Sequence, residues 1–335
     1  DMGLRHADID GDGFLDELVG FDAGNDGCTI VDRHTHLNNG NGWNHTVRTF
    51  GEVPRCFSNA NGIDFGTRIA DVNGDGKDDV IGGFEKSSDP VCTEDQKSTF
   101  LSNGTNWTLQ GDDWDTPYCF TKSDGLTDRG VRILDVNGDN FVDIIRGVSS
   151  QSSGGDCNTE NVWLNNAIVN GTGWKDVSNE IDLPICIVTS NGTDMGVRFG
   201  EVNGDGLVDI IVGRRDPGNG CDDDDKTVYL NTGNGWQNLS NEYDPPACFV
   251  GYTGKDQGYR LADINGDGLT DILYGLRVGI DCDPNEKKTW LNIGGKWVEQ
   301  TDEVWDSPLC FTIQTATQLL DFGIRTSDVN GDSSD

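Results

Sequence analysis

The sequence predicts an all-β fold: a propeller-type repeat array of four-stranded antiparallel blades, with five full blades and a C-terminal half-repeat. Three observations support this prediction. A nine-residue acidic motif recurs six times at intervals of 62 to 66 residues, two cysteines fall in each of the five full intervals, and short apolar segments alternate with Asn-Gly and Asp-Gly turns. Repeats of this length that contain several short strands are typical of propellers.

Each repeat predicts the same order of elements. It reads Gly-x-Arg, the acidic motif, an apolar strand, a polar loop with the first cysteine, a second apolar strand, a glycine-rich turn that ends in Trp, a weaker strand and the second cysteine. Turn residues at these intervals separate short strands. The predicted blades span residues 2–65, 66–129, 130–195, 196–257 and 258–322 of a single repeat domain over 1–335, and 323–335 form a partial repeat.

The acidic motif offers the ligands that a hard cation requires. Carboxylate or amide oxygens stand at positions 1, 3, 5 and 9, and position 7 would contribute its backbone carbonyl, a set that suits calcium. Glycine at position 4, and at position 6 in four of the six copies, lets the loop curl tightly. The absence of soft ligands argues against zinc or copper in these loops. Position 12 is never Glu, which excludes an EF-hand. We predict about one Ca²⁺ per repeat.

The predicted ligands are Asp8, Asp10, Asp12, Phe14 and Asp16; Asp71, Asn73, Asp75, Lys77 and Asp79; Asp135, Asn137, Asp139, Phe141 and Asp143; Glu201, Asn203, Asp205, Leu207 and Asp209; Asp263, Asn265, Asp267, Leu269 and Asp271; and Asp328, Asn330 and Asp332. The first loop, with four carboxylates, is expected to bind best. Glu201 is longer than Asp and is expected to alter the fourth site. The sixth loop lacks its ligand at position 9, so its occupancy stays open.

The ten cysteines fall two to a repeat, 27 to 29 residues apart within each pair. The pairs are Cys28 and Cys56, Cys92 and Cys119, Cys157 and Cys186, Cys221 and Cys248, and Cys282 and Cys310. This regularity predicts one disulfide per repeat and an oxidising, extracellular compartment. Pairing between adjacent repeats is the alternative that the spacing leaves open.

Six Asn-x-Ser/Thr sequons indicate N-glycosylation in the eukaryotic secretory pathway. They begin at Asn44, Asn103, Asn106, Asn170, Asn191 and Asn238. All except Asn191 lie within four residues of the Gly-x-Trp turn of their repeat, which argues against a chance distribution.

Composition excludes several classes of function. The formal net charge of −34 argues against binding of nucleic acid, which requires basic surface. No apolar run approaches the roughly 20 residues of a membrane span. The chain begins at Asp1 and shows no signal peptide, so a processed or partial chain is expected.

The repeat unit resembles the FG-GAP or VCBS repeat of integrin-α-like propellers. The resemblance rests on Gly-x-Arg-x-x-Asp-Val-Asn-Gly-Asp-Gly-x-x-Asp-Ile-Ile-x-Gly and on Leu-Asn-x-Gly-x-Gly-Trp, and it covers essentially the whole chain. It implies a calcium ion in the hairpin loop between the first two strands of each blade. Those propellers usually have seven blades, whereas this chain has five full repeats and a partial one.

The geometry of such blades predicts which loops lie on each of the two faces of the propeller. The metal loops and the Gly-Trp turns, with most sequons, are expected on one face, and both cysteine-bearing loops on the other. At the C-terminus, Gly323-Ile-Arg325 repeats the first strand that Gly3-Leu-Arg5 already supplies. The duplication leaves three readings open: a truncated or frayed end, an open array, or donation of 323–335 to another molecule.

Three further sets of residues can each be interpreted either functionally or structurally. Arg5, Arg68, Arg132, Arg198, Arg260 and Arg325 recur in the first strand; we favour pairing with a carboxylate of the neighbouring blade over a ring that binds anions. Trp43, Trp107, Trp174, Trp236 and Trp297 end the turns; we favour packing between blades over stacking on sugars. His34 and His36 share one strand face and could bind a transition metal, although the sequence identifies no further ligand.

These observations predict a non-enzymatic, secreted protein with a structural or adhesive role. Strand addition would make it the subunit of an extracellular fibre or coat. The partners predicted are other copies of the chain, covalent N-glycans, and extracellular glycans or cell-surface proteins. A carbohydrate-binding lectin is the alternative. An extracellular polysaccharide-cleaving enzyme ranks third, because no catalytic motif is evident.

Overall fold

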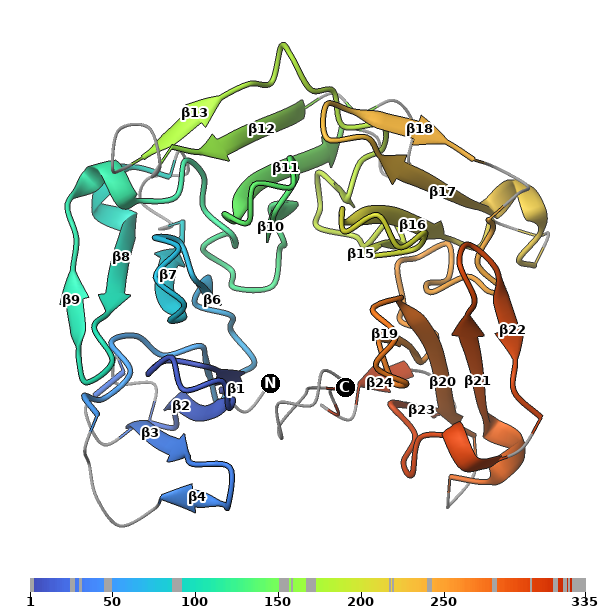
Figure 1. Cartoon of the computed structure of the whole chain (residues 1–335), viewed down its shortest axis with the longest axis horizontal. Helices are drawn as coiled ribbons and strands as arrows, with labels where there is room; N and C mark the ends of the chain where they lie inside the picture. Colours follow the sequence, from blue (N-terminus) through green and yellow to red (C-terminus); the bar gives the residue numbers. More distant parts are fainter. Residues whose placement is uncertain are drawn as a thin grey trace.

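The computed structural model describes residues 3–24, 28–29, 32–44, 50–85, 92–150, 157, 159–166, 173–216, 218, 220–239, 243–278, 282–301, 303–315, 319–321, 324 and 326. Across these residues the protein is all-β, and five small antiparallel sheets form the blades of a propeller ring (Figure 1). The first and fifth blades flank an opening, and no described blade lies between them. The predicted fold class is confirmed.

Each blade is a meander of four strands, and the first strand lies nearest the centre of the ring (Figure 1). The first blade contains β1 (Leu4–Ala7), β2 (Asp16–Asp22), β3 (Arg33–Asn38) and β4 (Trp43–Asn44). The second contains β6 (Thr67–Ala70), β7 (Asp79–Gly83), β8 (Lys97–Ser102) and β9 (Trp107–Leu109). The third contains β10 (Val131–Leu134), β11 (Asp143–Ser149), β12 (Thr159–Asn165) and β13 (Trp174–Asp176). The fourth contains β15 (Val197–Gly200), β16 (Asp209–Gly213), β17 (Lys226–Asn231) and β18 (Trp236–Asn238). The fifth contains β19 (Tyr259–Ala262), β20 (Asp271–Arg277), β21 (Lys287–Asn292) and β22 (Trp297–Glu299).

Short segments after the second cysteine add to this pattern. β5 (Ser58–Asn59), β14 (Val188–Thr189) and β23 (Thr312–Gln314) pair in parallel with the second strand of their blades, and β24 (Leu319–Asp321) pairs with β23. The helical segments of the described chain are 3₁₀ turns: η2 (Glu94–Gln96), η3 (Asp112–Trp114), η4 (Asp223–Asp225), η5 (Pro284–Glu286) and η6 (Glu303–Trp305).

The Gly of Gly-x-Arg is required where the chain enters each blade. Gly3 and Gly66 adopt φ of +64° and +61°, a conformation that disfavours other residues. Their carbonyl groups accept hydrogen bonds from Gly20 and Gly83 at 2.8 and 2.9 Å, and a Cβ on either would overlap the carbonyl oxygen of that partner. The same arrangement recurs in the other three blades, which explains this part of the repeated sequence.

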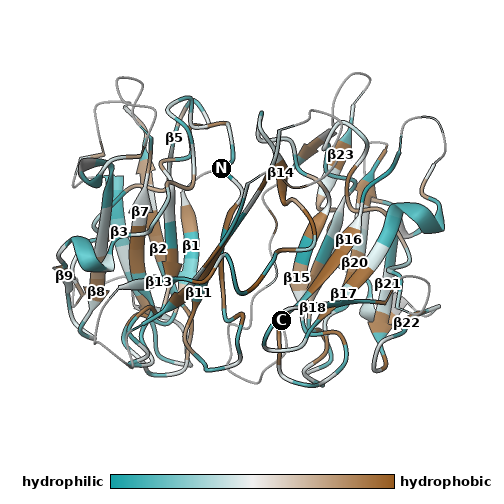
Figure 2. Ribbon diagram, turned by 90° about the horizontal axis from the view of Figure 1, so that it is seen from above, coloured by the Kyte–Doolittle hydropathy of each residue, from teal (hydrophilic) through white to brown (hydrophobic). Residues whose placement is uncertain are grey.

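The core is divided among the interfaces between consecutive blades. Each sheet has a leading face, which packs on the preceding blade, and a trailing face, which packs on the next. Between blades three and four, Ile145 and Val162 of one trailing face meet Ile210 of the next leading face, and all are at most 1% exposed. Equivalent clusters fill the other three interfaces. The hydrophobic segments accordingly lie mainly along the strands (Figure 2).

Five disulfides close the repeats, each within one repeat as predicted, with Cα–Cα distances of 5.1 to 5.8 Å. Pairing between adjacent repeats is therefore excluded. The cysteines lie in the β2–β3 type of connection and after the fourth strand, at the ends of the strands away from the acidic loops. In the chain-entropy model, closing a loop of this length contributes roughly 3–4 kcal/mol. Five disulfides are typical of secreted or extracellular proteins.

Candidate metal loops and the faces of the blades

The acidic loops connect the first and second strands of all five blades, and one hydrogen-bond pattern shapes them. In the first loop the Asp8 carboxylate accepts the N–H groups of Gly11 and Gly13 at 2.8 and 2.9 Å. The carboxylates of Asp71, Asp135, Glu201 and Asp263 accept the corresponding N–H groups in their own loops. The longer Glu201 therefore reaches the same partners as Asp. The sixth loop, with Asp328, Asn330 and Asp332, lies outside the described residues.

The carboxylate at position 9 begins the second strand and is fully buried in every described loop. Asp16, Asp79, Asp143, Asp209 and Asp271 are each 0% exposed. Their Oδ2 atoms accept the N–H of position 2 at 2.9 to 3.2 Å. Their Oδ1 atoms accept an N–H from the end of the third strand at 2.7 to 2.8 Å. Each of these carboxylates thus joins a loop to its own sheet.

Burial makes these carboxylates unusually hard to ionise. Loss of solvation, reinforced by the neighbouring carboxylates of the loop, raises the pKa of Asp16, Asp143 and Asp209 to about 7, although the two backbone hydrogen bonds oppose the shift. The same causes raise the pKa of Asp79 to about 8 and that of Asp271 to about 6. A cation beside the carboxylate would reverse this shift, because opposite charge favours the ionised form.

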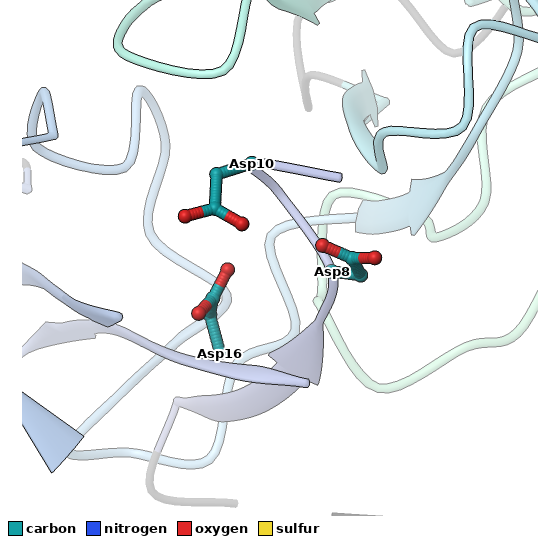
Figure 3. Close-up of side chains that lie close together, drawn as sticks. All are labelled: Asp8, Asp10 and Asp16. Atoms are coloured by element: carbon teal, nitrogen blue, oxygen red, sulfur yellow. The ribbon is translucent and has the colours of Figure 1, made fainter. Parts of the chain in front are cut away.

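The first loop brings its carboxylates closest together. Oxygen atoms of Asp8, Asp10 and Asp16 lie within 4.8 Å of one another (Figure 3). In the third loop the Asn137 amide instead donates to Asp139 at 3.1 Å, and the fourth and fifth loops share this contact. In the second loop, Lys77 Nζ lies 3.4 Å from Asp75. The donor sets consist of oxygen atoms and fit a hard cation such as calcium.

Hydrogen bonds also link the loops of blades two to four to the blade that follows. The Asn165 side chain on β12 donates to the carbonyl of Val72 in the preceding blade at 2.8 Å. Asn231 and Asn292 make the equivalent bonds to Val136 and Val202, also at 2.8 Å. Because these acceptors are position 2 of the acidic loops, the conformation of a loop and the packing of the next blade are coupled.

The repeated arginines pair with carboxylates, as we favoured. Arg68 and Arg132 lie 3.0 and 2.8 Å from Asp64 and Asp128, which precede them by four residues and follow the second cysteine of the preceding repeat. Arg198 and Arg260 pair with Asp194 and Asp256 in the same way. The guanidinium groups of three of these arginines, and that of Arg5, stand 5.1 to 5.8 Å above a phenylalanine ring of their own blade. These four ion pairs favour the structural interpretation over a ring that binds anions; Arg325 lies outside the described residues.

The turn tryptophans pack between blades, with one exception. Trp107, Trp174, Trp236 and Trp297 join the four interface clusters. Trp43 belongs to none of the clusters in the described chain and stacks instead on His6, with ring centroids 5.9 Å apart. The first blade thus presents its tryptophan on a leading face that has no described blade against it.

The sequons divide between the two faces of the ring. Asn103 and Asn106 are exposed in the β8–β9 turn, on the face of the acidic loops, and Asn238 is exposed on β18. Asn191 is exposed beyond β14, on the disulfide face. Asn44 lies on β4, and Asn170 falls outside the described residues. Their modification stays a prediction.

Sequence reasoning missed two sets of residues. The partners of the arginines, such as Asp64 and Asp128, recur four residues before each Arg, a signal that aligning the repeats would have revealed. The second set lies on the leading face of the first blade, where His6, Glu17 and His36 occupy adjacent strands. We had paired His36 with His34 instead; their ring centroids lie 6.3 Å apart.

The fold and the loops together define the class: a disulfide-closed β-propeller built from repeats with acidic hairpin loops. Residues 202–274 match the model of the FG-GAP-like repeat. The same strand order and acidic loop recur in all five blades, and the match therefore supports an FG-GAP-like repeat propeller.

One solved structure supports the fold. A lectin of Agrocybe aegerita, described as recognising non-reducing terminal N-acetylglucosamine, aligns with a TM-score of 0.52 and 20% identity over 88% of this chain and 64% of its own. The holotoxin pore of Photorhabdus luminescens aligns with a TM-score of 0.48 and 15% identity over 92% of this chain and 12% of its own. This chain therefore spans less than two thirds of the length of either protein. No curated protein matches the sequence. Among the described residues, no helix is long and apolar enough to cross a membrane.

Proposed function

We propose that this protein is a secreted, N-glycosylated, calcium-stabilised propeller with a non-catalytic structural or adhesive role. The observation that carries the proposal is the five-fold repetition of one loop, whose oxygen-bearing side chains at positions 1, 3, 5 and 9 include a fully buried carboxylate at position 9. Calcium suits such a ligand set. The loops would hold the ion through positions 1, 3, 5, 7 and 9, and the ion would neutralise carboxylates that are otherwise buried without a cation. The disulfides and the exposed sequons support passage through the eukaryotic secretory pathway.

Removal of calcium tests this proposal. A site at a hundredfold excess of calcium over its Kd contributes about 2.7 kcal/mol, and five coupled sites should therefore raise the Tm by roughly 10 °C or more. We expect a chelator to lower the Tm by this amount and added Ca²⁺, but not Mg²⁺, to restore it, as measured by differential scanning calorimetry. An unchanged Tm in the chelator would refute the metal assignment.

The ends of the array support assembly between copies. Ile324, in the partial repeat, packs beside Ala262, Leu273 and Phe311 of the fifth blade. Tyr259, the equivalent residue of the fifth repeat, occupies the corresponding place against the fourth blade. The partial repeat thus begins as another blade would, and strands from a second copy could complete it. Head-to-tail addition of this kind generates a fibre rather than a closed ring.

Oligomeric state tests the assembly. We expect calcium-loaded protein to form head-to-tail oligomers in light scattering and negative-stain microscopy, and deletion of 323–335 to abolish them. If both forms are monomeric at every concentration tested, strand addition is wrong, while the chelation result for the calcium sites stands independently.

Carbohydrate binding is the second candidate, favoured by one cavity. A space of about 310 Å³ on the disulfide face is lined by Arg55 and by Phe65 and Phe84, whose rings contact edge to face at 5.9 Å. Aromatic faces with a few polar groups suit small ligands, and the likeness to the lectin suggests N-acetylglucosamine-terminated glycans as the first to test. Glycan-array binding that Phe84→Ala removes and Trp43→Ala spares would support this function, whereas turnover of a polysaccharide would overturn both candidates.

A further inference from the structure

The leading face of the first blade differs from those of the other four in one row of side chains. In each blade, the strand registers place one residue from each of the first three strands side by side on this face. In blades two to five the rows are Ile69, Val80 and Phe100; Ile133, Ile144 and Trp163; Phe199, Ile210 and Tyr229; and Leu261, Ile272 and Trp290. In the first blade the row is His6, Glu17 and His36.

Two side chains of this row, those of His36 and Glu17, already lie close together, and His6 is their neighbour in the strand register. His36 Nε2 lies 3.9 Å from Glu17 Oε1 on the adjacent strand. The His6 ring stacks on Trp43 at 5.9 Å, although β1 and β4 are separated by β2 and β3. The His6 and Trp43 side chains must therefore reach toward each other across the sheet, over the strands that carry Glu17 and His36.

The row is also accessible. His6 is exposed, and the side chains of His36 and Glu17 are 25% and 27% exposed. The apolar rows of the other blades are covered by the preceding blade, and Val80, Ile144, Ile210 and Ile272 are each 0% exposed. Solutes can thus reach the first row as they cannot reach the others.

We propose that His6, Glu17 and His36 form a binding site for a divalent transition-metal ion of the Zn²⁺ class. Two imidazoles and one carboxylate are a ligand set that zinc accepts, and imidazole favours transition metals over calcium. The ligand atoms of the three residues do not all lie within 4.8 Å of one another. Neighbouring residues across adjacent strands stand about 4.5–5.5 Å apart at Cβ, so a turn of the His6 side chain away from Trp43 would let all three reach a single ion. The site is distinct from the acidic loops, whose ligands are oxygen atoms.

His34 provides the matched control. It belongs to the neighbouring row, opposite Val19 and Leu4, and its Nδ1 lies 4.0 Å from Glu52 Oε2. His34→Ala therefore removes an imidazole from the same face without removing a ligand of the proposed site.

Zinc titration of the full chain, saturated with Ca²⁺ to occupy the acidic loops, tests the proposal. We expect calorimetry to find one saturable Zn²⁺ site, and Co²⁺ to give the visible absorption of a low-coordinate complex. His6→Ala, Glu17→Gln and His36→Ala should each weaken zinc binding at least about tenfold, which corresponds to ~1.4 kcal/mol, and His34→Ala should leave it unchanged. Circular dichroism and the calcium-saturated Tm check that each variant is folded.

Three results would overturn the site. The first is the absence of saturable zinc binding to the parent protein. The second is loss of binding in His34→Ala with retention in His6→Ala, which would assign the metal to His34 and His36. The third is equal binding by all four variants, which would place the zinc elsewhere.

Discussion

The first blade and the third share their loops but differ in the face they present. Asp16 and Asp143 occupy the same position, accept the same two backbone hydrogen bonds and have the same raised pKa. On the leading face, however, Glu17 stands where Ile144 stands. Ile144 is fully buried against the second blade, whereas the Glu17 side chain is 27% exposed.

This difference distinguishes residues required within every repeat from residues whose identity depends on the neighbouring blade. Loop residues act within the blade and, through position 2, on the following blade, so they recur in the first blade as in the others. The leading face matters only where a blade precedes it. His6, Glu17 and His36 make this row polar in the first blade, whereas the corresponding rows of the other four blades are apolar.

Exchanging the two side chains should have the largest effect. Ile144→Glu buries a carboxylate without a partner in an apolar interface, and we expect it to destabilise the protein by about 4 kcal/mol or more, or to prevent folding. Glu17→Ile should change the stability by less than about 1 kcal/mol, because the position is partly exposed. Urea denaturation of both calcium-loaded variants measures the difference. Equal losses would mean that the first leading face is buried as the others are.

The turn tryptophans of the first and fifth blades differ in the same way, because in the described part of the chain only that of the fifth is packed against a preceding blade. Trp297 is 8% exposed, and its Nε1 donates to the carbonyl of Thr270 at 2.9 Å, so Trp297→Ala should cost roughly 3–5 kcal/mol. Among the described residues, the ring contact of Trp43 is with His6. Trp43→Ala should therefore lower the free energy of unfolding by only about 1 kcal/mol. Thermal unfolding in calcium compares the two. If Trp43→Ala is as costly as Trp297→Ala, the first tryptophan is covered by another part of the molecule.

The features that recur in every repeat could be predicted from the sequence, whereas the row of residues that differs in the first blade could not. The spacing of the acidic motifs located the five blades, and the regular cysteine pairs predicted the disulfides, because both signals recur with one period. The burial of Asp16 and its equivalents could not be read from the motif, since it depends on an N–H from the third strand, some 22 residues away. The His6, Glu17 and His36 row was missed because single strands were read alone, and only their registers bring the three residues together.

The shared loops predict a pH dependence that calcium should reverse. An acid whose pKa is raised in the folded state binds more protons there than in the unfolded state, so stability is present at low pH and is lost as pH rises from about 4 to about 8. In chelator, the Tm should therefore fall by several °C between pH 5 and pH 8. With saturating calcium it should not fall, because binding requires the ionised carboxylates.

A salt control separates this effect from general charge repulsion. The protein has a formal charge of −34 at pH 7, and repulsion among its acidic groups also lowers the stability as pH rises. At 1 M NaCl, however, interactions between exposed charges are screened beyond roughly 3 Å, whereas buried carboxylates are affected much less. The loss of Tm in chelator should therefore persist at high salt. A profile that becomes flat in salt would assign the effect to surface charge instead of to Asp16 and its four equivalents.

The smallest expected effect concerns one backbone position at which the first and third loops differ. Position 6 is Gly13 in the first loop and Asn140 in the third, with φ of +89° and +66°. Both N–H groups donate to the carboxylate at position 1, at 2.9 and 2.8 Å. Asn tolerates positive φ better than most residues, and Gly adopts it without steric cost. Asn140→Gly and Gly13→Asn should therefore each change the free energy of unfolding by less than about 1 kcal/mol and with opposite signs, as measured by urea denaturation in calcium. Calorimetry should find the number of bound calcium ions unchanged, because the side chain at position 6 is not a ligand; loss of an ion in Gly13→Asn alone would mean that the first loop needs a conformation the third does not adopt.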